Sequence, residues 1–262
     1  MPTTKGFQLV DSDLLLLRHV YALRLATIDH LAALSGRSYK RAQERLDKLV
    51  GEKYLKLVRK RPEKHVYAID REGAAALIHQ GHAPRELAGR RLRENELKPL
   101  GIQHAVFIAD IHAKLIMLTQ ARSLELSRWV EGPSLWDRVT TSNNAVIPIR
   151  PDAWFTIEGS AGSLHFFLEA DRGTMAHSRM REKVTGYSAY FQQRRHLAKF
   201  EGMDFFRVAT VTATRGRADG LAAEFKSMMP ARWAAAYPVI AFDDLTLERL
   251  APELARETAA VT

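Results

Sequence analysis

Hydrophobic and polar positions near the start of the chain follow the spacing of helices and then that of strands. Capping residues and apolar spacing predict three helices, over residues 11–23, 27–34 and 38–55. Two short strand-like runs follow at residues 55–60 and 65–70, and the polar turn between them predicts a β-hairpin. Three helices followed by a hairpin are typical of a winged helix-turn-helix. We therefore expect residues 1–80 to form a DNA-binding domain of that type.

The third predicted helix and the hairpin carry the candidate DNA contacts. In a winged helix the start of this helix enters the major groove, where arginine pairs with guanine and glutamine with adenine. The hairpin tip would contact phosphates, which position the protein without reading sequence. We predict DNA-binding residues in both elements: Arg37, Ser38, Lys40, Arg41, Gln43, Arg45, Arg59, Lys60, Arg61 and Lys64.

The distribution of charge favours the same interpretation. The 262-residue chain has a formal net charge of +9, and most of this excess falls within residues 37–64. That segment holds 11 Lys or Arg and four Asp or Glu. A concentration of positive charge of this kind is typical of a surface that binds a phosphate backbone. The alternative is a basic surface that is only solvated.

A polar, charged segment at residues 81–97 is predicted to be a linker, and the pattern changes after it. Helical and strand-like runs then follow in the order α-β-β-β-α-β-α-β. The predicted helices are 101–121, 175–197 and 217–229, and the predicted strands are 124–130, 146–157, 164–171, 205–214 and 237–242. This order predicts an α/β (α+β) domain with a central mixed sheet over residues 98–245, followed by a C-terminal tail over 246–262.

Acidic residues on two neighbouring predicted strands, followed by a basic helix, form the main candidate for chemistry. Asp152 begins one strand region, Glu169 and Asp171 end the next, and Lys183 lies on the helix after them. Mg²⁺ prefers oxygen ligands, so two carboxylates and a phosphate would make a plausible metal site that activates water. The alternative is a metal-free network in which Lys183 or nearby arginines (Arg172, Arg179) neutralise the acids.

The element order and these acids resemble the PD-(D/E)xK nuclease-like superfamily, which has the restriction-endonuclease fold. Asp152 matches the first acid of that motif and Glu169 the second, whereas Asp171 stands where the motif has lysine. Lys183 on the following helix is the candidate substitute. If the domain is active, the resemblance implies Asp152, Glu169, Asp171 and Lys183 as catalytic residues, with Mg²⁺ held by Asp152 and Glu169. A degenerate nuclease fold, kept for binding, is the other possibility.

A narrower resemblance covers residues 10–215. The segments Arg150–Ala153 and Glu169–Thr174, with Lys183 and Tyr187 behind them, are similar to the replication-relaxation family of plasmids and mobile elements of bacteria. Membership implies a role at a plasmid origin, in replication control or in relaxing and mobilising DNA. It does not imply cleavage.

These observations lead to one preferred function and two alternatives. We expect a double-stranded-DNA-binding accessory or regulator of plasmid or mobile-element replication or transfer, whose second domain serves dimerisation or partner binding. A Mg²⁺-dependent DNA endonuclease (nickase) and a transcriptional repressor of a mobile element are the alternatives. The expected partners are duplex DNA, a second copy of the chain, and plasmid replication or relaxosome proteins, with no membrane. The chain has no cysteine, no recognisable signal peptide and only short apolar runs, so we expect a cytoplasmic protein.

Overall fold

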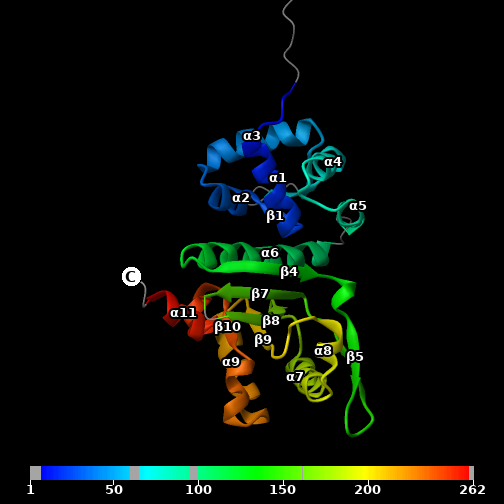
Figure 1. The fold of residues 1–262 in the computed structure, drawn as a ribbon, viewed down its shortest axis with the longest axis vertical. Coiled ribbons are helices and arrows are strands. Elements are labelled where there is room, and N and C mark those ends of the chain that lie inside the picture. The colour runs from blue at the N-terminus through cyan, green and yellow to red at the C-terminus, as the bar shows by residue number, and fades with distance from the viewer. Residues whose placement is uncertain (1–6, 60–64, 95–98, 161, 260–262) are drawn as a thin grey trace, which may run out of the picture. The chain divides into compact units, whose positions relative to one another are not determined.

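The computed structural model describes residues 7–59, 65–94, 99–160 and 162–259. Its contacts divide the chain into two compact units, unit 1 (residues 1–113) and unit 2 (residues 114–262). The division falls inside helix α6 (Pro99–Gln120). The elements of both units are labelled in Figure 1.

Unit 1 has the element order that the sequence predicts for a winged helix. In chain order its elements before α6 are α1 (Asp11–Leu23), β1 (Ala26–Thr27), α2 (Ile28–Ser35), α3 (Tyr39–Gly51), β2 (Leu55–Arg59), β3 (Val66–Ile69), α4 (Arg71–His79) and α5 (Arg85–Glu94). The three strands form an antiparallel sheet in the order β1-β3-β2. Gly36, in the left-handed conformation with φ of 66°, ends α2 and allows the sharp turn into α3.

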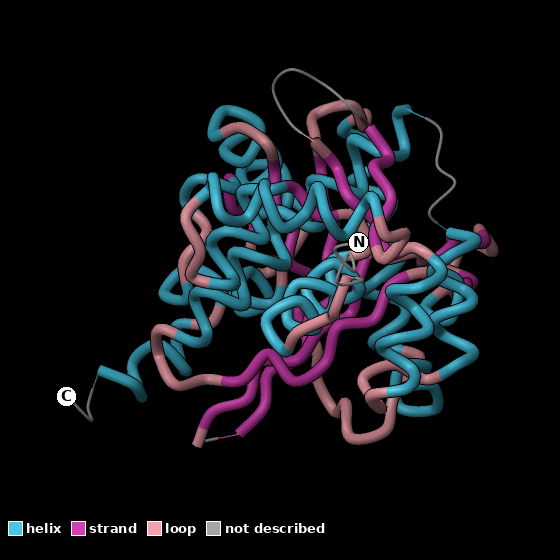
Figure 2. Tube along the Cα trace, turned by 90° about the horizontal axis from the view of Figure 1, so that it is seen from above, coloured by secondary structure: helices cyan, strands magenta, loops and turns pink. Residues whose placement is uncertain are grey.

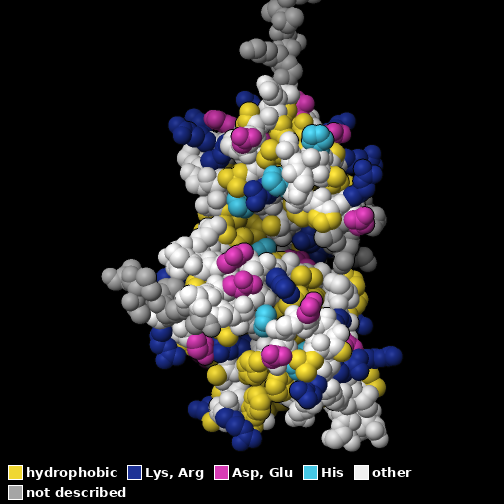
Figure 3. Space-filling model, in the orientation of Figure 1, with side chains coloured by type: hydrophobic (Ala, Val, Ile, Leu, Met, Phe, Trp, Pro, Cys, Tyr) yellow, Lys and Arg dark blue, Asp and Glu magenta, His cyan; other side chains and the backbone are white. Residues whose placement is uncertain are grey.

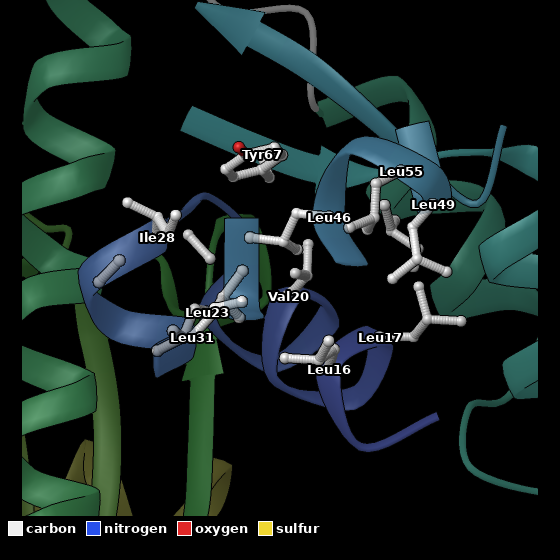
Figure 4. Packing of buried hydrophobic residues seen from close by; sticks show 14 of the residues in the cluster. Leu16, Leu17, Val20, Leu23, Ile28, Leu31, Leu46, Leu49, Leu55 and Tyr67 are labelled. Atoms are coloured by element: carbon white, nitrogen blue, oxygen red, sulfur yellow. The ribbon is translucent and has the colours of Figure 1, made fainter. Parts of the chain in front are cut away.

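The core of unit 1 explains why α1 and α3 form where the apolar spacing places them. Leu16, Leu17 and Val20 of α1 meet Leu46 and Leu49 of α3, and all five are buried. Figure 4 shows these side chains pointing toward one another. Full burial of each contributes on the order of 1.5–3 kcal/mol. The polar side chains of α3 therefore lie on its outer face, where they can contact a ligand.

Unit 2 is built on a five-stranded mixed sheet, as the sequence predicts. The strand order is β10-β9-β8-β7-β4; β8, β9 and β10 run parallel, and β4, β7 and β8 pair antiparallel. The sheet strands are β4 (Glu125–Glu131), β7 (Ala153–Gly159), β8 (Gly162–Asp171), β9 (Arg207–Thr212) and β10 (Val239–Ala241). The helices and 3₁₀ turns that follow β8 are α7 (His177–Gln192), α8 (Arg195–Lys199), α9 (Arg215–Met228), η2 (Ala231–Ala236), η3 (Phe242–Asp244), α10 (Leu247–Leu250) and α11 (Pro252–Ala259).

An aromatic core joins this sheet to α7. Phe167 of β8 stacks on Tyr187 of α7 at 5.6 Å between ring centroids, and Tyr190 and Phe206 pack edge-on around Phe167. All four rings are buried. Figure 2 shows the strands in magenta with helices in cyan beside them. This packing fixes α7 against the sheet at the ends of β7 and β8, where the candidate acids lie.

The predicted single strand over residues 146–157 is wrong, because it divides into two strands of different sheets. β6 (Val146–Ile149) pairs with β5 (Asp137–Thr140) in a separate hairpin that follows the turn η1 (Pro133–Leu135), and β7 starts at Ala153 in the main sheet. Pro151, which has no N–H to donate, lies between them and ends the run.

The predicted linker and tail contain regular structure. Residues 85–94 form α5, whereas residues 95–98 lie outside the described residues. The segment predicted as a tail includes α10 and α11, whose Leu250 and Leu254 are buried. Arg207 of β9 pairs with Glu253 of α11 at 2.7 Å. Apolar residues at helical spacing fold this segment onto unit 2.

Helix α6, predicted over residues 101–121, contains a long apolar stretch. Residues 100–120 are long and apolar enough to cross a membrane, although they include polar residues such as His104 and Asp110. Half of that window is buried inside the protein. The same length and hydropathy are found in core helices, so this stretch gives only weak evidence of a membrane span.

Candidate functional sites

The amino-terminal end of α3 is an exposed basic surface. Ser38 caps the helix by accepting the N–H of Arg41, and the first turn has no acidic residue. Lys40 and Arg41 are exposed, and so is Tyr39, with 53% of its surface accessible. Arg37, just before the cap, is half-buried. Three cations and an aromatic ring therefore lie at one helix end, and the first acid of the helix, Glu44, lies one turn further along.

Arg45, a predicted DNA contact, has a structural partner instead. Its Nε donates to Asp13 Oδ1 at 2.5 Å, its Nη2 donates to Asp13 Oδ2, and its guanidinium lies 4.8 Å from the ring centre of Phe7. Asp13 is fully buried and also accepts the N–H of Val10. The hydrogen bond that Arg45 donates to Asp13 raises the pKa of Arg45 above its usual value. Arg45 thus ties α3 to the start of α1, and its position gives no support for a role in reading bases.

The remaining predicted DNA contacts lie at the start of α3 and on the β-hairpin. Gln43 is half-buried, and the Ser38 hydroxyl is already used in the helix cap. On the hairpin, Arg59 ends β2, where its backbone pairs with Val66. Lys60, Arg61 and Lys64 lie outside the described residues. The phosphate contacts of the hairpin tip therefore remain predictions.

In unit 2 the structure brings together three of the four predicted catalytic residues. Asp152 lies just before β7, and its Oδ2 accepts the N–H of Ala170 in β8 at 2.8 Å. Glu169, also in β8, is 3% exposed. Its Oε2 accepts a hydrogen bond from Lys183 Nζ, and its Oε1 accepts one from the Tyr187 hydroxyl at 2.6 Å. Lys183 and Tyr187 are four residues apart on α7, so one helix face supplies both donors.

Asp171, the fourth, is held by a residue that sequence reasoning missed. Arg217 of α9 donates its Nε to Asp171 Oδ2 at 2.6 Å and its Nη2 to the carbonyl of Met175 at 2.6 Å. The N–H of Gly173 donates to Asp171 Oδ1 at 2.9 Å. β8 and β9 are parallel, so the helix that follows β9 starts beside the end of β8. Two sequence features could have indicated this pair: the order of strands and helices, and the arginine that opens the predicted helix 217–229.

Burial dominates the electrostatics of the acidic cluster. It raises the pKa of Glu169 to about 7, although the Lys183 ammonium favours the charged carboxylate and so lowers that pKa. Burial also lowers the pKa of Lys183, but Glu169 and Asp152 outweigh it and raise that pKa overall. A cationic Lys183 therefore neutralises the cluster, with Arg217 doing the same for Asp171. Arg179, one of the arginines considered for this role, is exposed.

These residues do not fit a Mg²⁺ site as they are arranged. Both oxygens of Glu169 already accept hydrogen bonds from the protein, and a metal would have to displace the Lys183 ammonium. Among the described residues no group of three or more His, Asp or Glu has an arrangement that could hold a metal. The geometry matches the metal-free ion-pair network better than the catalytic arrangement.

Comparison with known proteins supports the narrower of the two resemblances. A model of the replication-relaxation family matches residues 17–203, well over half of the chain. Neither curated proteins nor solved structures give a match. The match covers α2, α3 and the hairpin region as well as Asp152, Glu169 and Lys183. This chain belongs to the replication-relaxation family.

Proposed function

We propose that this protein binds double-stranded DNA through α3 as an accessory or regulatory protein of plasmid or mobile-element replication or transfer. The replication-related part of this role follows from the family. Duplex binding is our inference from unit 1, and the two parts of the proposal are tested separately.

The observation that carries the proposal is the exposed basic end of α3. Lys40, Arg41 and Tyr39 project from the first turn of a helix whose opposite face is buried in the core. In a winged helix this end of the helix meets base edges, while the β-hairpin lies along the phosphates. Residues 37–43 hold three cations and no Asp or Glu, and the acids of α3 begin only at Glu44.

Unit 2 then has a binding role and no catalytic one. Lys183 and Arg217 neutralise the acids from within the protein, so the cluster stabilises the ends of β7 and β8. This supports a degenerate nuclease-like domain that serves dimerisation or contact with replication or relaxosome proteins. Two-fold symmetric DNA sites commonly bind homodimers, so a palindromic footprint would support a dimer.

Footprinting on DNA of the plasmid or mobile element that encodes the protein tests this function. A protected site within the replication or transfer origin, lost in Arg41→Ala, supports an accessory role in replication or transfer. Protection confined to a promoter would instead favour the transcriptional repressor. Absence of any protected site, with the protein folded, would contradict duplex recognition.

A further inference from the structure

Unit 2 contains an open cavity beside α7. It has a volume of about 730 Å³ and is bounded by α7, the β5–β6 hairpin and the segment from the end of α9 through η2. Ligand sites commonly fall in the range of about 300–1,000 Å³. Of the four candidate catalytic residues, none lines this cavity. We call it the α7 groove.

Aromatic and thioether side chains form the walls of the α7 groove. Phe191 lines the groove and lies edge-on to Trp233 and to Phe205, each at 5.7 Å between ring centroids. Phe205 is 41% exposed and Met228 is 36% exposed, so apolar surface that folding usually buries faces solvent here. Figure 3 shows hydrophobic side chains gathered where α7 and α9 approach each other, with Lys and Arg at the margin.

Cations predominate in the segments that line the α7 groove, although Asp137 and Asp204 lie close to lining residues in the sequence. The three segments that supply most of its lining, residues 138–146, 184–195 and 226–237, contain no Asp or Glu. They contain five cations, namely Arg138, Arg194, Arg195, Lys226 and Arg232. Arg195 pairs with Asp137, while Arg232 is exposed and lines the groove. The occupant that complements this edge is anionic.

Neutral polar groups complete the lining. Gln192, Thr185 and Ser142 offer amide and hydroxyl groups that can both donate and accept hydrogen bonds. Such groups suit the edges of bases, because bases present donors and acceptors without charge. An acidic peptide would use the cations as well, but it would not need flat aromatic walls with neutral hydrogen-bonding groups between them.

We propose that the α7 groove binds single-stranded DNA. Bases would stack on Phe205 and the neighbouring rings, and phosphates would meet Arg232 and the cations beside it, which is the usual combination in proteins that hold single strands. This site goes beyond the proposed duplex contact of α3 and uses different residues in the other unit. A protein acting where duplex DNA opens would then contact both forms of DNA.

Fluorescence anisotropy of a labelled oligothymidylate of about 15 nucleotides tests the proposal on the full chain. Wild type should bind it, more weakly as salt rises. Phe205→Ala and Arg232→Ala should each weaken binding by about 5- to 100-fold. Leu197→Ala and Arg249→Ala change an exposed apolar residue and an exposed cation that do not line the groove, and they should bind as wild type does.

Two further arms separate this site from α3. Arg41→Ala should keep single-strand affinity while losing duplex affinity, and Phe205→Ala should do the reverse. Photocrosslinking of a bromodeoxyuridine oligonucleotide should label peptides from residues 184–195 or 226–237. If wild type does not bind the oligonucleotide, or if the groove variants bind it as well as the controls do, the proposal is overturned and a peptide becomes the better candidate occupant. Duplex binding measured in parallel shows whether the α3 assignment stands regardless.

Discussion

Lys183 and Glu169 form an ion pair in the interior of unit 2, although they lie 14 residues apart on α7 and β8. The Tyr187 hydroxyl donates to the second oxygen of the same carboxylate at 2.6 Å. A side chain that resembles a nuclease lysine therefore neutralises an acid that resembles a nuclease metal ligand. This relationship favours a structural reading of the cluster.

Removing Lys183 should destabilise the protein strongly. Lys183→Met removes the cation from buried Glu169, which must then take up a proton, and breaking one side of a buried pair costs about 3–5 kcal/mol. Urea unfolding at neutral pH measures this loss. Arg179→Met changes an exposed cation on the same helix and should lie within about 0.5 kcal/mol of wild type. Adding Glu169→Gln to Lys183→Met should restore part of the stability; a double variant as unstable as the single one would argue against the pair.

Metal should not turn this protein into a nickase. Supercoiled plasmid carrying the element's origin should stay supercoiled with the protein and Mg²⁺ or Mn²⁺, because Lys183 and Tyr187 occupy the Glu169 oxygens. Gel electrophoresis of the plasmid gives the readout. Asp152→Asn is the matched variant, since its amide oxygen can still accept the Ala170 N–H. Nicking by wild type that disappears in Asp152→Asn would establish the endonuclease alternative.

Replacing Arg45 should lower the stability of the protein, whereas replacing Arg41, one turn away on α3, should not. Arg45→Ala strips the buried Asp13 of its ion pair, so unfolding free energy should fall by about 3–5 kcal/mol. Arg41 is exposed, and Arg41→Ala should leave stability within about 0.5 kcal/mol of wild type. Chemical denaturation of the two variants checks this. Equal stability of both would show that the Asp13–Arg45 pair contributes little.

His112 should make unit 1 sensitive to acid. Burial, assisted by the nearby Arg91, His30 and His19, lowers the pKa of His112 from 6.5 to about 3. The unfolded chain therefore binds a proton at His112 at a higher pH than the folded chain does. The stability contributed by neutral His112 is complete above pH 6.5 and is lost as pH falls from 6.5 toward 3. By pH 5 the loss should reach about 2 kcal/mol.

The variant His112→Leu isolates that contribution from other titrating groups. Its stability should fall less than that of wild type between pH 7 and pH 5, by about 2 kcal/mol, in parallel urea titrations. His82→Leu alters an exposed histidine and should keep the wild-type pH dependence. Identical pH dependence in wild type and His112→Leu would rule out His112 as the source.

Sequence reasoning succeeded where one local pattern determines the structure. The apolar spacing of Leu46 and Leu49 determines which side of α3 faces the core, and therefore which side carries Lys40 and Arg41. The same holds for the mixed sheet, because the order of strands and helices leaves few ways to pair them. Placing Asp152 beside Glu169 needed only the assumption that consecutive strands are neighbours.

It failed where the outcome depends on a partner far along the chain. Asp171 is paired with Arg217, 46 residues later, and no spacing rule connects them. Arg45 lies among other cations in the sequence, but in the structure it donates hydrogen bonds to Asp13 of α1. The break between β6 and β7 depends on a proline and on the choice between two pairing strands, so an apolar run alone could not locate it.

Duplex binding through α3 is the central claim, and the affinity of Arg41→Ala for the footprinted DNA tests it most directly. Anisotropy titrations should show this variant binding its specific site more weakly by about 1–3 kcal/mol. Arg71→Ala, which changes an exposed arginine at the start of α4, should bind as wild type does. If both folded variants retain wild-type affinity, Arg41 does not read DNA and the proposed role of α3 is contradicted.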